Sequence, residues 1–215
     1  MKTIGLTQRV VIDPRHGERR DCLDQRWAAF ILACGFRPLP LPNNREAALL
    51  LLNDIDGLVL TGGNDLAFHG GDAPERDAAE LSLLAACEQD ERPMLGVCRG
   101  MQVIQHRYGV PLQRVTGHVA RHQTITIDGT SADVNSFHNF GTTETRPPLE
   151  VWAVAPDRIV KAVRRPDSLV TGIMWHPERL HPFAERDMAL VRKLFCGRDA
   201  KRGIQRDKLS VKESS

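Results

Sequence analysis

The sequence lacks several features that would place a protein in a class at once. Its formal net charge is only +2, which is too small to indicate a nucleic-acid-binding protein. No apolar run approaches the roughly 20 residues that a membrane-spanning helix needs. The N-terminal residues turn polar too early for a signal peptide. We therefore expect neither a nucleic-acid partner nor an association with membranes.

Cysteines are few and irregularly spaced. There are five, no two form a Cys-x-x-Cys pair, and their odd number argues against a disulfide framework. Their spacing matches no metal-binding pattern, so we expect no metal and no other cofactor. A reduced, soluble, cytoplasmic protein follows. No internal repeat or interdomain linker is evident, so we expect one domain over residues 1–196. The polar, aperiodic residues 197–215 predict a disordered tail.

The N-terminal half alternates strand and helix patterns. Strands are predicted at residues 4–7, 37–42, 56–60 and 94–97. Helices are predicted at residues 23–34, 44–52, 74–89 and 101–108, and residues 8–20 are predicted to form a polar loop. This alternation predicts an α/β, flavodoxin-like parallel sheet with helices on both faces. In such sheets, functional sites form at the carboxyl ends of the strands.

Beyond Pro111 the pattern changes to short β-rich segments. Antiparallel pairs are predicted between residues 123–127 and 132–135, and between residues 151–154 and 159–163. A buried strand at residues 169–175 and a closing helix at about 184–195 complete the domain. We therefore expect a small antiparallel β addition in the C-terminal half.

One stretch, residues 92–102, combines a buried strand, a sharp turn and a helix start. Cys98 lies at the apex of its Gly-x-Cys-x-Gly turn, in the place that serine takes in a nucleophile elbow. Glycines flank such an apex because its backbone is strained and tightly packed. The dipole of the following helix favours a thiolate. The alternative is a buried structural cysteine beside two ordinary turn glycines.

A thiol nucleophile needs a base, and that base needs an orienting group. His176 follows a predicted buried strand, and Glu178 lies two residues later, within reach of the imidazole. A lone histidine is more often structural. The cysteine elbow together with the Trp-His-Pro-Glu pattern instead predicts a triad of Cys98, His176 and Glu178.

At these motifs the sequence resembles the class I (triad) glutamine amidotransferase-like family. The shared stretches occur in the family's order at residues 60–65, 93–102, 134–138 and 175–178. The resemblance implies that Cys98 attacks a γ-glutamyl carbonyl, with His176 as base and then acid and Glu178 orienting it. It implies an oxyanion hole made by the backbone N–H groups of Gly63 and Arg99. It also implies substrate contacts at Gly62, Asn64, Gln102, Asn135, Ser136 and Phe137. For Asn135 and Ser136, the alternative is a simple turn preference.

Members of that family differ in what happens to the released amine. The Gly-Gly-Asn-Asp turn at residues 62–65 is similar to that of the stand-alone hydrolases. It predicts hydrolysis of a small γ-glutamyl amide to glutamate and an amine through a thioester on Cys98. Residues 67–70 depart from the proline-rich continuation that is common there. The alternative is a glutaminase subunit that delivers ammonia to a separate synthase. A pseudoenzyme or sensor is disfavoured, because all three triad positions are filled.

An arginine cluster follows the first predicted strand. Arg9, Arg19 and Arg20 lie in or beside this loop, and guanidinium groups match phosphate bidentately. We hypothesise a substrate whose amine side is anionic, bearing a phosphate or a nucleotide. Such a substrate is similar to that of the γ-glutamyl-CDP-amidate hydrolases of bacterial capsule phosphoramidate synthesis. The alternative is a solvated loop.

Overall fold

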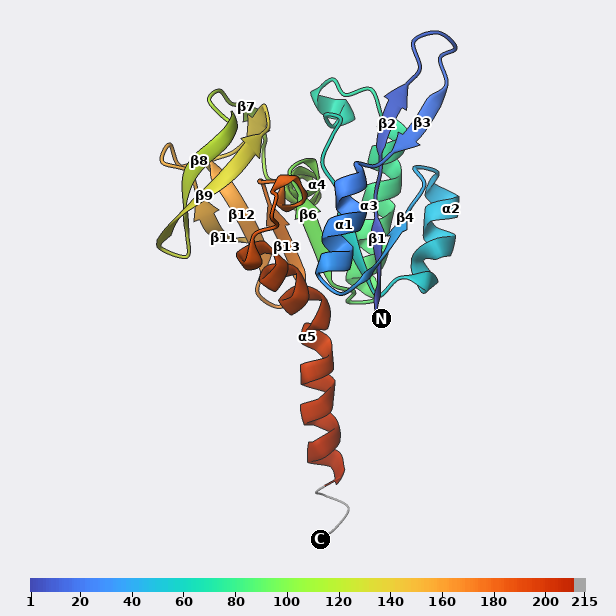
Figure 1. The fold of residues 1–215 in the computed structure, drawn as a ribbon, viewed down its shortest axis with the longest axis vertical. Helices are drawn as coiled ribbons and strands as arrows, with labels where there is room; N and C mark the ends of the chain where they lie inside the picture. Colours follow the sequence, from blue (N-terminus) through green and yellow to red (C-terminus); the bar gives the residue numbers. More distant parts are fainter. Residues whose placement is uncertain (211–215) are drawn as a thin grey trace.

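The computed structural model describes the backbone of residues 1–210 and the side chains of residues 1–197. Its centre is a nine-stranded sheet (Figure 1). In spatial order the strands are β4 (Arg37–Pro40), β1 (Thr3–Leu6), β5 (Gly57–Leu60), β6 (Met94–Val97), β13 (Val170–Ile173), β12 (Val160–Arg165), β11 (Glu150–Val154), β8 (Val119–Ile127) and β9 (Thr130–Phe137). The core consists of apolar side chains from these strands and from the helices that cover them.

The first five strands of this order are parallel to one another. Counted along the chain, these five have the order 2-1-3-4-5, which is that of flavodoxin-like sheets. The predicted fold is confirmed. The proline-rich strand β4 lies at the edge, where its missing N–H groups leave no gap in a central ladder.

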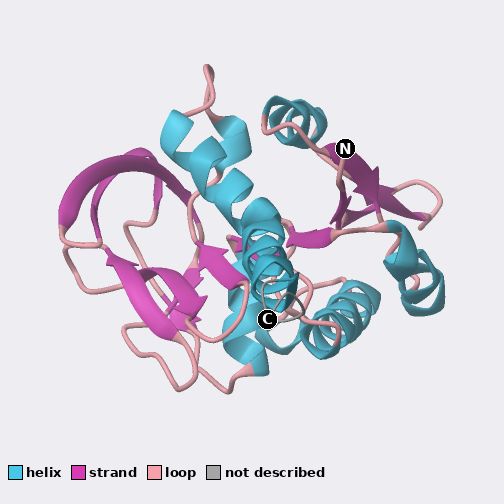
Figure 2. Ribbon diagram, turned by 90° about the horizontal axis from the view of Figure 1, so that it is seen from below, coloured by secondary structure: helices cyan, strands magenta, loops and turns pink. Residues whose placement is uncertain are grey.

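Helices cover both faces of this sheet (Figure 2). They are α1 (Gln25–Ala33), α2 (Arg45–Leu50), α3 (Pro74–Gln89), α4 (Arg99–Arg107) and α5 (Glu185–Ser210). A Cβ added to Gly172 would meet Met101 of α4, whereas one added to Gly57 would meet Phe195 of α5. The register places these two glycines on opposite faces, so α4 and α5 cover opposite sides of the sheet.

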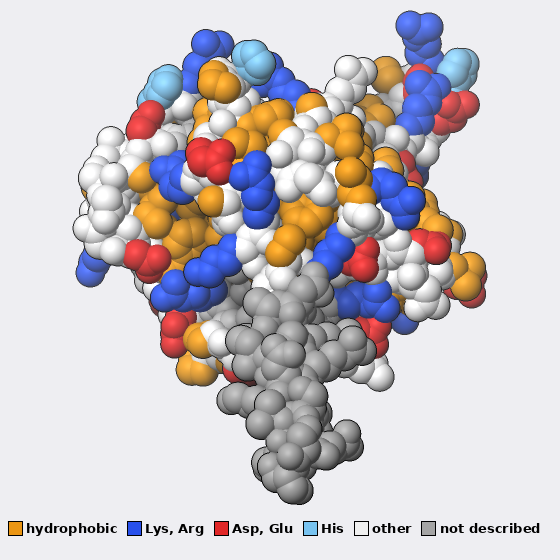
Figure 3. Space-filling model, turned by 60° about the horizontal axis from the view of Figure 1, so that its bottom comes forward, with side chains coloured by type: hydrophobic (Ala, Val, Ile, Leu, Met, Phe, Trp, Pro, Cys, Tyr) orange, Lys and Arg blue, Asp and Glu red, His pale blue; other side chains and the backbone are white. Residues whose placement is uncertain are grey.

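The antiparallel addition is confirmed, and it continues the same sheet. β12, β11, β8 and β9 follow β13 in successive antiparallel pairs. Two short strands, β7 (Gln113–Arg114) and β10 (Phe140–Gly141), pair beside it. On the face that Figure 3 shows, basic and acidic side chains are interspersed among apolar ones, as the small net charge leads one to expect.

One prediction was wrong. Residues 8–20 are not a loop but contain most of a hairpin, formed by β2 (Arg9–Ile12) and β3 (Arg19–Cys22). This hairpin extends from the upper right of the molecule in Figure 1. The overlooked signal is the β-branched run Val10-Val11-Ile12, which favours a strand despite the arginines around it.

The closing helix begins as predicted and continues beyond residue 195, since α5 is described to Ser210. The disorder proposed for residues 197–215 stays a prediction, because side chains from residue 198 and all of residues 211–215 lie outside the described residues. None of the helices described here combines the length and the apolar character needed to cross a membrane.

Candidate active site

The turn between β6 and α4 has the geometry of a nucleophile elbow. Cys98 adopts φ 53° and ψ −106°, a conformation that non-glycine residues rarely take, and it is the N-cap of α4. A Cβ on Gly100 would lie 1.9 Å from the Leu60 carbonyl oxygen, and one on Gly96 would lie 2.6 Å from the Gly100 backbone. The glycines are therefore required by close packing, as the sequence predicted.

His176 and Glu178 meet beside this turn. His176 Nδ1 lies 2.7 Å from Glu178 Oε1, and both side chains are buried. Burial opposes protonation of the imidazole, but the charge of Cys98 and hydrogen bonds with Cys98 and Glu178 outweigh it and raise the pKa of His176 to about 9. The structure thus brings the three predicted triad residues together, with the imidazolium form favoured between Cys98 and Glu178.

The Gly62–Gly63 turn follows β5, the strand that pairs with β6, and it lies against Cys98 and His176. A Cβ on Gly62 would lie 2.6 Å from His176 Cε1 and 3.5 Å from Cys98 Cβ. Gly63 has φ 89°, which favours glycine. The side chain of Asn64 is already hydrogen-bonded within the protein. Its amide both donates to and accepts from the Val10 backbone at 2.9 Å.

The predicted substrate-binding segment of β9 also surrounds Cys98. The Phe137 carbonyl oxygen lies 3.7 Å from Cys98 Sγ, and the Phe137 ring meets the His176 ring edge-on. Asn135 and Ser136 are buried, and their side chains hydrogen-bond the backbones of His176 and His118. Gln102 donates to the Phe140 carbonyl oxygen at 3.0 Å. These positions cluster at the site, but the polar side chains among them already have protein partners.

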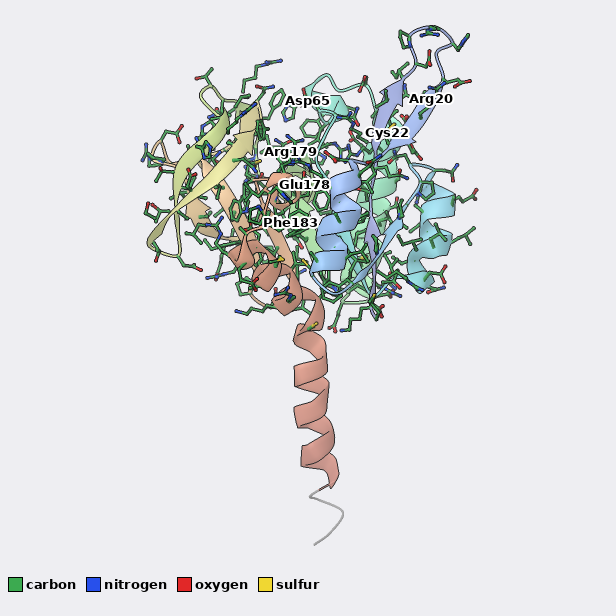
Figure 4. The ribbon with its side chains drawn as sticks, in the orientation of Figure 1. Arg20, Cys22, Asp65, Glu178, Arg179 and Phe183 are labelled. Atoms are coloured by element: carbon green, nitrogen blue, oxygen red, sulfur yellow. The ribbon has the colours of Figure 1, made fainter. Side chains whose placement is uncertain are left out.

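The three predicted arginines separate in the structure. Arg19 donates to Glu75 at 2.6 Å, and Arg20 donates to Glu18. Figure 4 labels Arg20 on the hairpin. Only Arg9 lines a cavity of about 190 Å³ beside the site. Its stem packs on Gly63, with Arg9 Cδ 3.0 Å from the position of a Cβ there.

Sequence reasoning missed a second arginine in that cavity. Arg179 lines it together with Gly62, Gly63 and His176, and its guanidinium lies over the Phe137 ring at 4.9 Å from the centroid. Figure 4 shows Arg179 next to Glu178. The available signal was its position directly after the Trp-His-Pro-Glu motif.

Buried charged residues outside the motifs were also missed. Lys161 of β12 donates to Ser136 Oγ at 2.9 Å and lies 2.7 Å from His138 Nε2. Arg76 and Glu80 of α3 pair at 2.9 Å behind the Gly62–Gly63 turn. The available signal was an Arg–Glu pair four residues apart in a helix rich in alanine and leucine.

The sequence is similar to known hydrolases. A family model described as peptidase C26 matches residues 3–126 and 118–178. A γ-glutamyl-CDP-amidate hydrolase of Campylobacter jejuni is 31% identical over 181 residues, which cover 82% of this chain and 90% of that protein. A γ-glutamyl-γ-aminobutyrate hydrolase of Escherichia coli O157:H7 is 28% identical over 225 residues, covering 84% and 86%.

A solved structure supports the fold. The crystal structure of a glutamine amidotransferase from Thermotoga maritima superposes with a TM-score of 0.65 at 15% identity, covering 100% of this chain and 86% of that one. At that identity the likeness concerns the fold alone.

Proposed function

The chain belongs to the peptidase C26 family, and from this membership and the site geometry we propose that it is a cysteine-dependent hydrolase of γ-glutamyl amides. The observation that carries the proposal is the strained Cys98 elbow placed against a buried His176–Glu178 pair. This arrangement provides a nucleophile, its proton-transfer partner and an orienting carboxylate in one place. The two relatives named above as γ-glutamyl hydrolases support the same reaction class.

The reaction proceeds in two halves. The Cys98 thiolate attacks the γ-carbonyl carbon, and the carbonyl oxygen becomes an oxyanion that accepts from the N–H groups of Gly63 and Arg99. Each such donor typically lowers the barrier by about 3 kcal/mol. The His176 imidazolium gives its proton to the amine nitrogen as the C–N bond breaks, which leaves a γ-glutamyl thioester.

Water completes the second half. Neutral His176 takes a proton from a water molecule while the water oxygen attacks the thioester carbonyl carbon. The C–S bond then breaks, glutamate leaves, and the thiolate and imidazolium are restored. Glu178 holds Nδ1 throughout, so Nε2 is the nitrogen that exchanges protons with the amine and the water.

We further propose that the amine side of the substrate is anionic and bears a phosphate or a nucleotide. Arg9 and Arg179 face one cavity beside the Gly62–Gly63 turn. Within the described part of the chain, Arg9 forms no salt bridge, so its guanidinium is available to an anion. The Campylobacter jejuni relative, whose name specifies a CDP-amidate, supports this choice.

Steady-state hydrolysis by the isolated chain tests the proposal. The panel is glutamine, γ-glutamyl-aminobutyrate and a γ-glutamyl phosphoramidate nucleotide, with Cys98→Ala as the control. We expect turnover of the phosphoramidate to exceed that of glutamine and to vanish in Cys98→Ala. Activity retained in Cys98→Ala would contradict the mechanism. If the folded chain hydrolysed none of the three amides, a glutaminase subunit that needs a synthase would be favoured.

A further inference from the structure

Behind the proposed oxyanion hole lies a cluster of charged side chains shielded from solvent. Its central members, Arg76 and Glu80 of α3 and Arg99 of α4, are 0%, 0% and 1% exposed. Buried ion clusters are often no more stable than apolar side chains of the same volume. Fold stability alone therefore gives little reason for this cluster.

Arg76 holds the turn that carries Gly63. Its Nη2 donates to the carbonyl oxygens of Thr61 at 2.8 Å and Gly62 at 3.1 Å, and its Nη1 donates to that of Gly63 at 2.7 Å. The Gly62 carbonyl and the Gly63 N–H belong to one planar trans peptide unit and point in opposite directions. Fixing the Gly62 oxygen on Arg76 therefore aims the Gly63 N–H away from α3.

The Glu80 carboxylate connects the two residues, Arg76 and Arg99, that lie behind the proposed oxyanion hole. Glu80 Oε1 accepts from Arg76 Nε at 2.9 Å, and Glu80 Oε2 accepts from Arg99 Nη1. Asp77 accepts from the other terminal nitrogen of Arg99. Arg99 supplies the second proposed oxyanion donor through its backbone N–H. The Glu80 carboxylate thus links Arg76, which orients the Gly63 N–H, to Arg99, whose backbone N–H is the second donor.

We propose that Arg76, linked through Glu80 to Arg99, is a positioning residue that preorganises the oxyanion hole. The inference rests on the proposed γ-glutamyl hydrolase function. Arg76 touches no substrate and acts through the Gly62–Gly63 peptide unit. Without its guanidinium three carbonyl oxygens lose their donor, and the Gly63 N–H is no longer held toward the forming oxyanion.

The test compares Arg76→Met and Arg76→Lys with Arg37→Met. Arg37 donates to Thr3 Oγ1 at the amino-terminal edge of the sheet, so its loss removes a guanidinium far from the site. Three quantities are measured: kcat and KM for the amide that wild type hydrolyses best, the rate of Cys98 alkylation by iodoacetamide, and hydrogen–deuterium exchange of residues 61–66. Alkylation needs the thiolate but no oxyanion hole.

For Arg76→Met we expect kcat to fall by about 100-fold, with KM and the alkylation rate within about threefold of wild type. Exchange at residues 61–66 should rise. Arg76→Lys keeps a cation opposite Glu80 but cannot span three carbonyl oxygens, so we expect it to fold and to lose about tenfold in kcat. Arg37→Met should behave as wild type in all three measurements.

Wild-type kcat and exchange in a folded Arg76 variant would overturn the inference. So would a parallel loss of hydrolysis, alkylation and folded fraction, which indicates a purely structural role. If Arg76→Met does not fold, Arg76→Lys decides the question. A wild-type protein that hydrolyses no γ-glutamyl amide would contradict the proposed function. Unchanged hydrogen–deuterium exchange of residues 61–66 in the variants would contradict the role of Arg76.

Discussion

The side-chain amide of Asn135 holds the backbone of His176 on both sides. Asn135 Nδ2 donates to the His176 carbonyl oxygen at 2.8 Å, and the His176 N–H donates to Asn135 Oδ1 at 2.8 Å. Asn135 lies in β9, His176 lies three residues beyond the end of β13, and both are buried. This pair fixes the position from which the imidazole reaches Cys98, which gives Asn135 a supporting role. The substrate contact that the resemblance implied for Asn135 stays a prediction.

Replacing Asn135 with alanine should therefore reduce both stability and activity. Two buried backbone groups lose their partners, at about 1–3 kcal/mol each, so we expect the free energy of unfolding to fall by about 2–6 kcal/mol. The displaced imidazole should lower kcat by about 100-fold. Urea denaturation and steady-state kinetics measure these effects. Asn139→Ala, which removes an exposed asparagine nearby, is the control. If Asn135→Ala were as stable as the control, Asn135 would not support the backbone of His176.

The raised pKa of His176 predicts the alkaline limit of catalysis. The reaction needs the imidazolium in the free enzyme, so kcat/KM should decline only as pH passes about 9. Glu178 helps to raise this pKa through its hydrogen bond to Nδ1. In Glu178→Gln we therefore expect the alkaline limb to move to lower pH, together with a lower kcat. The pH profile of Glu185→Gln, on the exposed start of α5, should match wild type. An unmoved alkaline limb in Glu178→Gln would refute this assignment.

Features that depend on neighbouring residues could be predicted from the sequence. The helix Pro74–Gln89 begins at a proline and was predicted with its observed bounds. The helix predicted from residue 44 is also present, and Asn44 caps it by accepting from the Ala47 N–H. The Cys98 elbow was recognisable because the strand, the two glycines and the helix are adjacent in the chain.

Features that depend on distant partners could not be predicted. Arg76 resembles a surface residue of an i,i+4 pair until the turn at residues 61–63 is placed against it. Similarly, Asn135 gains its role from a residue 41 positions away. The roles of the arginines depended on the hairpin, since pairing of β2 with β3 directs Arg19 and Arg20 toward acidic neighbours and leaves Arg9 at the cavity.

Gly62 offers a test of how little room the imidazole has. The backbone at Gly62 does not have a positive φ, so alanine causes no conformational strain there. Its Cβ would lie 2.6 Å from His176 Cε1, however, and one of the two must move. We expect Gly62→Ala to lower kcat by about 100-fold through displacement of the imidazole. Gly197→Ala, whose Cβ would have its nearest neighbour 4.0 Å away, should keep wild-type kinetics. Full activity in Gly62→Ala would show that the imidazole can relocate without cost.

The two arginines of the cavity should determine which amine is accepted. A charge-assisted hydrogen bond contributes about 1.5–3 kcal/mol, so Arg9→Ala and Arg179→Ala should each lower kcat/KM for a γ-glutamyl phosphoramidate nucleotide by about 10- to 100-fold. Turnover of glutamine should change little in Arg9→Ala, because its leaving group is neutral ammonia. Arg179 Nε also lies 3.5 Å from Glu178 Oε1, so Arg179→Ala should lower turnover of both substrates, and that of the phosphoramidate more. Arg20→Ala is the matched control, since Arg20 pairs with Glu18 and Asp13 on the hairpin. The ratio of kcat/KM for the two substrates is the quantity to compare. An equal loss on both substrates would mean that these arginines support the site itself. Unchanged kcat/KM for both substrates in Arg9→Ala and Arg179→Ala would exclude an anionic leaving group held by this cavity.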